Sequence, residues 1–200
     1  MRRRGDLTEP LQIRVDDDRR TVRCCRIAGS LRECTTYRRL TEGEALVADG
    51  QLYGRSTCSA LVITCSDFRF KSIERSFLEA AGLTDDYDLI ARPGAARALV
   101  APRDTAARET MLDEIQLLRD LHRFDRVLLI NHMSCRAYDD LATGEAQRAV
   151  HEAHLRAAAT GLERQFDGLA AETYLIDLVD GALRVDPLPA TKRDRWSAHH

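Results

Sequence analysis

The sequence lacks long apolar runs. No stretch of its 200 residues approaches the ~20 uninterrupted apolar residues that a membrane-spanning helix needs. The first residues also lack the apolar segment of a secretory signal. Both absences argue against a membrane protein and a secreted one, so we expect a cytoplasmic protein. In a reducing cytoplasm the six cysteines are expected to be thiols or metal ligands instead of disulfides.

Several common active-site motifs are missing as well. No Gly-x-Gly-x-x-Gly opens a predicted helix, so a dinucleotide site would lack its phosphate cradle. A tyrosine-phosphatase loop needs an arginine six positions after its cysteine, but Lys71 stands six positions after Cys65. Cys24, Cys25 and Cys34 form no Cys-x-x-Cys knuckle and have no convincing fourth ligand, which argues against a metal centre there.

Charge is unevenly distributed along the chain. The formal net charge is −2, yet residues 1–40 hold eleven arginines against six acidic residues. An arginine-rich arm can bind nucleic acid or an acidic partner. The interleaved carboxylates of Asp16, Asp17 and Asp18 favour a solvated, partly disordered leader instead, and we expect neither a nucleic-acid nor a membrane partner.

Strand and helix patterns alternate from residue 59 onward. Strands are predicted at 60–64, 87–91 and 126–130, and helices at 71–81, 104–122 and 144–166. Two β-prone runs, 173–179 and 182–185, flank Asp180-Gly181, a strong hairpin signal. This order predicts an α/β fold, with a mostly parallel β-sheet flanked by helices on both faces and a C-terminal hairpin. We expect an Arg-rich leader at 1–58, one domain at 59–187 and a polar tail at 188–200.

Two short segments carry the candidate chemistry. Cys65-Ser66-Asp67-Phe68-Arg69 and His132-Met133-Ser134-Cys135 each follow a run of apolar and β-branched residues. Both are therefore expected at the carboxyl ends of buried parallel strands, where ligands collect in open α/β sheets. Two thiolates and a neutral imidazole are the ligand types of a catalytic zinc that keeps a fourth position for water. Cys65, His132 and Cys135 are accordingly the predicted metal ligands.

Asp67 and Arg69 are predicted to act beside that metal. Alternation along an extended segment would place Cys65, Asp67 and Arg69 on one side. A carboxylate paired with arginine stays an acceptor and can orient a zinc-bound water. The alternatives are an ordinary exposed ion pair and, for Cys65, a buried cysteine that only fills space.

Cys-x-Asp-x-Arg followed by His-x-x-Cys on parallel strands resembles the β-class carbonic anhydrases over residues 59–187. The resemblance implies zinc held by Cys65, His132 and Cys135, with Asp67 and Arg69 as the catalytic dyad. It also implies reversible hydration of carbon dioxide to bicarbonate by a zinc-bound hydroxide, and a homodimer or higher homo-oligomer with active sites near the subunit interface.

The sequence departs from that family at three places. Arg136 follows the last ligand where the family usually has glycine, Arg92-Pro93-Gly94-Ala95 replaces Arg-Asn-Ala-Gly, and Phe68 replaces a small residue. The loop change is expected to remove an amide side chain and a backbone donor. Two other functions therefore stay open: hydrolysis of a related molecule such as carbonyl sulfide, and an inactive zinc-binding role with the leader as contact surface.

Three histidines are conceivable proton shuttles, because imidazole titrates in the useful range. They are His122, His151 and His154. We expect each of them to be a surface residue of a helix, and none is assigned.

Overall fold

The computed structural model describes residues 12–15, 21–25, 36–38 and 54–189. The chain divides into two units, residues 1–53 and 54–200. In the first unit, β1 (Gln12–Val15), β2 (Thr21–Cys25) and β3 (Thr36–Arg38) form an antiparallel sheet in the order β1-β2-β3. These three strands were not predicted from the sequence.

Other expectations for the chain ends are not addressed by the described residues. Residues 1–11, 16–20, 26–35 and 39–53 of the leader, which include Cys34, and the tail from residue 190 lie outside them, as do the side chains of Cys24 and Cys25. Within the described residues, no helix combines the length and apolar character needed to cross a bilayer.

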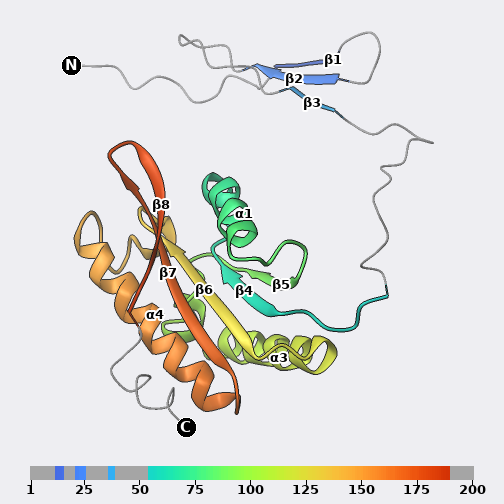
Figure 1. Ribbon diagram of the computed structural model, residues 1–200. Helices are drawn as coiled ribbons and strands as arrows, with labels where there is room; N and C mark the ends of the chain where they lie inside the picture. The colour runs from blue at the N-terminus through green and yellow to red at the C-terminus, as the bar shows by residue number, and fades with distance from the viewer. Residues whose placement is uncertain (1–11, 16–20, 26–35, 39–53, 190–200) are drawn as a thin grey trace. The chain divides into compact units, whose positions relative to one another are not determined.

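The second unit is built on a five-stranded sheet in the order β5-β4-β6-β7-β8 (Figure 1). Its strands are β4 (Ala60–Thr64), β5 (Tyr87–Ala91), β6 (Arg126–His132), β7 (Ala170–Val179) and β8 (Ala182–Pro187). The first four run parallel, and β8 returns antiparallel to β7. Asp180 and Gly181 both have positive φ, 51° and 79°, as a type I′ hairpin turn requires. The predicted α/β fold is confirmed.

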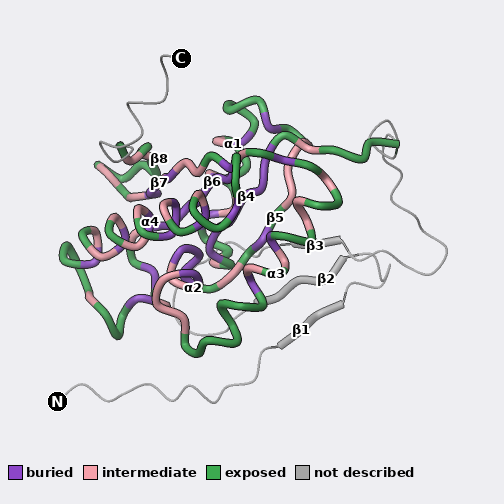
Figure 2. Tube along the Cα trace, turned by 90° about the horizontal axis from the view of Figure 1, so that it is seen from below, coloured by how far each residue is buried: buried purple, intermediate pink, exposed green. Residues whose placement is uncertain are grey.

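Helices cover both faces of this sheet. They are α1 (Lys71–Ala80), α2 (Arg97–Val100), α3 (Thr105–His122) and α4 (Ala146–Gln165), with 3₁₀ turns at Phe68–Phe70 and Arg136–Tyr138. Leu61 and Ile63 pack in one core with residues of α2, α3 and α4, whereas Ala60 and Val62 pack with α1 in a second core. Since alternate residues of β4 enter opposite cores, both faces of the strand are buried (Figure 2).

The two central strands place their ends side by side. β4 pairs with β6 in parallel register, with Thr64 opposite Ile130. Cys65 follows the last residue of β4, and His132 is the last residue of β6. The two residues therefore leave neighbouring strands at the same edge, as the sequence analysis required.

Candidate metal centre

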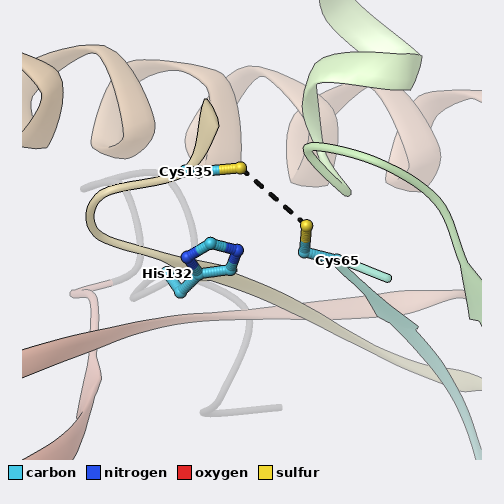
Figure 3. Close-up of side chains that lie close together, drawn as sticks. All are labelled: Cys65, His132 and Cys135. Carbon is cyan, nitrogen blue, oxygen red and sulfur yellow. Dashed lines mark hydrogen bonds between the residues drawn. The ribbon is translucent and has the colours of Figure 1, made fainter. Parts of the chain in front are cut away.

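Three predicted ligands converge at the carboxyl edge of the sheet. Cys65 Sγ, Cys135 Sγ and one ring nitrogen of His132 all lie within 4.8 Å of one another, and all three residues are buried. The two sulfur atoms are 3.8 Å apart (Figure 3). In a tetrahedral zinc site two thiolates also lie about 3.8 Å apart, because each Zn–S bond is about 2.3 Å long.

The ring of His132 presents a free lone pair to this point. Its Nδ1 lies 2.8 Å from the carbonyl oxygen of Met133, which can only accept, so Nδ1 carries the proton. Its Nε2 is buried and has no hydrogen-bond partner among the described residues. The Phe70 ring stacks on the imidazole with centroids 4.0 Å apart. A buried nitrogen without a partner is costly, and a metal ion would satisfy it.

A sharp bend and a buried amide place Cys135. Ser134 has φ 56°, in the left-handed region, and turns the chain back after β6. Gln147 Oε1 accepts a hydrogen bond from the Cys135 N–H at 3.1 Å, and its Nε2 donates to the Cys135 carbonyl at 3.3 Å. Gln147 was not predicted as a site residue, because nothing in the sequence distinguishes it from other polar residues of an alanine-rich helix.

A glycine loop and a buried acid support Cys65. The Gly94 N–H donates to Cys65 Sγ at 3.3 Å. Gly94 has φ 80°, and a Cβ there would lie 3.2–3.3 Å from three neighbouring atoms, so only glycine fits. On the other side, Lys71 Nζ donates to the Cys65 carbonyl at 2.5 Å and pairs with the buried Glu74. Pro93 has no N–H, whereas the next residue of this loop, Gly94, supplies a backbone donor to the site.

The two thiols together favour a cation. The hydrogen bond between the two sulfur atoms lowers the pKa of Cys65. The same contact and burial raise the pKa of Cys135, because a second thiolate would lie beside the first. Alone, the pair therefore retains one proton. A divalent cation would remove the repulsion and allow both sulfurs to be thiolates.

Arg69 holds Asp67 beside the three ligands. Its Nη2 donates to Asp67 Oδ2 at 2.7 Å, its Nε lies 3.0 Å from Oδ1 and 3.1 Å from Oδ2, and its backbone N–H donates to Oδ1 at 3.0 Å. Nη2 also donates to the Ser134 carbonyl at 3.1 Å. Asp67 Oδ2 lies 3.9 Å from His132 Nε2. The hydrogen bonds from Arg69 lower the pKa of Asp67 to about 2, so it is a carboxylate at neutral pH.

The backbone conformation that brings Asp67 and Arg69 together differs from the predicted one. Residues 68–70 form a 3₁₀ turn and not an extended segment, so strand alternation does not explain the position of Arg69. Asp67 caps this turn by accepting from the Arg69 N–H, and the cap itself brings the two side chains together.

The unusual residues near the site face outward. Phe68 is 85% exposed, and Arg136 is also exposed, so neither fills the space around the thiols.

The histidines differ from one another. His122 and His154 are partly exposed, but His151 is fully buried, so the surface interpretation is wrong for His151. Its Nδ1 accepts a hydrogen bond from Asn131 Nδ2 at 2.9 Å, and burial lowers its pKa to about 3.

The chain is similar to several known proteins. A protein-family model described as "Putative carbonic anhydrase" matches residues 55–179. An uncharacterized protein of Rickettsia bellii is 33% identical over 62% of this chain and 79% of its own length. One of Rickettsia conorii is 31% identical over 68% of this chain and 76% of its own. Among solved structures, the β-carbonic anhydrase CafA of Aspergillus fumigatus is 17% identical, covering 72% of this chain and 81% of that chain with a TM-score of 0.45.

Proposed function

Because the chain belongs to the putative carbonic anhydrase family, we propose that it binds zinc and catalyses the reversible hydration of carbon dioxide to bicarbonate. The proposed ligands are Cys65, His132 and Cys135. One observation carries this proposal: two buried thiols converge on a buried imidazole nitrogen that has no partner among the described residues.

The donor set fits zinc in type and in number. Two thiolates and a neutral imidazole are soft or borderline ligands, and three protein ligands leave a fourth position open. Zinc bound in this way activates a water molecule at neutral pH by lowering its pKa to ~7.

Asp67 is proposed to accept the hydrogen of the reacting water. A carboxylate has about four acceptor positions, and three N–H groups of Arg69 occupy most of them. One position stays available toward the site, where Oδ2 lies 3.9 Å from His132 Nε2. Arg69 is proposed to keep Asp67 in an outer position, beside the metal ligands but not bound to the metal. A released carboxylate could itself bind the metal.

Burial of the ligands restricts the substrate to small molecules. Cys65, His132 and Cys135 are all nearly inaccessible to solvent, and the Phe70 ring covers the imidazole. Carbon dioxide meets this restriction, and carbonyl sulfide would meet it as well. Assays with both gases would separate these substrates.

Self-association is proposed through the β5 edge of the sheet. Leu89 on β5 and Leu117 on α3 are both exposed and line one shallow groove. Leu121, which lies one helical turn beyond Leu117, is exposed too. Exposed leucines beside an edge strand are costly in water and suit contact with a second copy of the chain.

Metal analysis with a stopped-flow hydration assay tests the proposed function. The parent protein should hydrate carbon dioxide, and Cys135→Ser should lose one equivalent of zinc together with its activity. Arg136→Gln is the control, because Arg136 directly follows Cys135 but is exposed and belongs to neither group of possible metal ligands. This control should keep its activity. Zinc at Cys135 without turnover would refute the enzyme and favour a binding role, and unchanged zinc in Cys135→Ser would refute the ligand assignment.

A further inference from the structure

A second group of metal-ligand side chains lies at the opposite edge of the sheet. Cys58, Asp88 and His122 offer a sulfur, a carboxylate oxygen and a ring nitrogen that all lie within 4.8 Å of one another. The Asp88 Oδ2 and His122 Nδ1 atoms are 2.7 Å apart. Cys58 precedes β4, Asp88 lies near the start of β5, and His122 ends α3. None of them contributes to the centre at Cys65.

Backbone contacts hold the three residues together. The Cys58 N–H donates to the His122 carbonyl at 3.1 Å, which ties the segment before β4 to the end of α3. Asp88 is paired in register with Leu61 of β4, and the next backbone bond, from the Ser59 N–H to the Asp86 carbonyl, is also 3.1 Å. The backbone positions of the three residues thus follow from secondary structure, so only their side chains must be ordered when an ion binds.

We propose that Cys58, Asp88 and His122 form a second site for a divalent cation of the zinc type. One thiolate, one carboxylate and one imidazole suit zinc, and three protein ligands leave one position for water. The side chains of Asp88 and His122 are 18% and 39% exposed, so an ion and its water can reach them from solvent. Because the ligands come from three elements, a bound ion would cross-link the entry to β4, the β5 strand and the end of α3.

A simple ion pair explains only part of this arrangement. Asp88 and His122 can hydrogen bond without a metal, and a protonated histidine is favourable at a helix C-terminus. That account leaves out Cys58, whose sulfur lies with them and is partly buried. The Cys58 thiol donates to the Ala60 carbonyl at 3.4 Å, and its sulfur becomes available to a cation once that hydrogen is displaced.

The geometry needs little adjustment. In a tetrahedral site a nitrogen and an oxygen ligand lie about 3.4 Å apart, because their bonds to zinc are each about 2.0–2.2 Å long. Asp88 Oδ2 and His122 Nδ1, now 2.7 Å apart through a shared hydrogen, would separate by less than an ångström when that hydrogen is displaced.

Cobalt(II) titration of the full chain tests this site, because cobalt replaces zinc and reports thiolate ligation through sulfur-to-metal absorption. We expect Cys58→Ser and Asp88→Asn each to lose one cobalt equivalent relative to the parent. Cobalt affinity at this site should fall by more than about 100-fold, because even the loss of an outer hydrogen-bond partner costs 10–100-fold. Cys58→Ser should also lose the absorption that belongs to one thiolate.

Asp120→Asn is the matched control. Asp120 lies near the end of α3, bonds only Gln116 among the described residues, and carries the same charge as Asp88. It should keep the full cobalt stoichiometry. The asparagine of Asp88→Asn has the shape of aspartate and can still accept a hydrogen bond from His122. This variant therefore tests the proposed metal site even if Cys58→Ser folds poorly. Unchanged stoichiometry in Asp88→Asn, or equal losses in Asp88→Asn and Asp120→Asn, would overturn the proposal. Neither outcome bears on zinc at Cys135, which its own variant tests.

Discussion

Arg69→Gln isolates the role of the Asp67–Arg69 pair. Glutamine removes the guanidinium and its contacts to Asp67 and to the Ser134 carbonyl, but it keeps the backbone cap on Asp67. The side chains of Arg69 and Asp67 are 44% and 19% exposed, so solvent screens the pair and its net contribution is about 1–2 kcal/mol. This energy corresponds to roughly a 5- to 30-fold change in how often the carboxylate leaves its outer position.

A released carboxylate would compete for the open position of the metal. Because Asp67 Oδ2 lies only 3.9 Å from His132 Nε2, a side-chain rotation is enough for this competition. We therefore expect kcat/KM for carbon dioxide hydration to fall by about 5- to 30-fold or more in Arg69→Gln, while zinc content stays equal to that of the parent.

Cobalt-substituted protein distinguishes blockage of the open metal position by Asp67 from a general disruption of the site. Azide, a small anion that binds an open metal position, should change the visible spectrum of the parent and bind Arg69→Gln more weakly by a similar factor. Adding Asp67→Asn to Arg69→Gln removes the competing charge, so azide affinity should recover although turnover does not. If Arg69→Gln binds azide as the parent does, or if it loses zinc, the restraining role assigned to Arg69 is wrong.

Two further predictions concern stability and assembly. His151 has a pKa of about 3 in the fold and about 6.5 when unfolded, so its neutral form stabilises the fold fully above pH 6.5 and this stability is lost as the pH falls toward 3. In urea unfolding, the free energy of unfolding of the parent should fall between pH 7.5 and pH 5 by about 2 kcal/mol more than that of His151→Gln. Equal decreases in both proteins would contradict the assignment. Leu89→Asp should yield monomers by light scattering where the parent is a dimer or larger, whereas Leu141→Asp, at another exposed leucine, should not. A parent that is monomeric throughout would refute self-association.

The strands of the second unit could be predicted because their signal is local. β4 and β5 match their predicted ranges residue by residue. In a chain whose strand and helix patterns alternate, short apolar and β-branched runs bounded by polar residues rarely form anything but strands. The ligand triad followed from topology, because parallel neighbours end at one edge. α3 also matched its predicted range to within one residue.

The supporting residues could not be predicted, because their roles depend on distant contacts. Gln147 is twelve residues from the cysteine that it holds, and its helical position resembles that of any polar neighbour. His151 has the sequence context of a surface residue, yet helix packing buries it. The 3₁₀ turn after Asp67 was missed because one capping contact decided it against the extended alternative.

The hydrogen-bond partner of His132 has a consequence for Lewis acidity. Metal-binding histidines often donate to a carboxylate, which makes the imidazole a stronger electron donor and leaves the ion less able to polarise what it binds. Here the Nδ1 hydrogen is directed to the peptide oxygen of Met133, a neutral group. Two thiolates would place two negative charges on an ion held by Cys65, His132 and Cys135. A neutral partner on the third ligand would avoid quenching such an ion further and would preserve its power to acidify water.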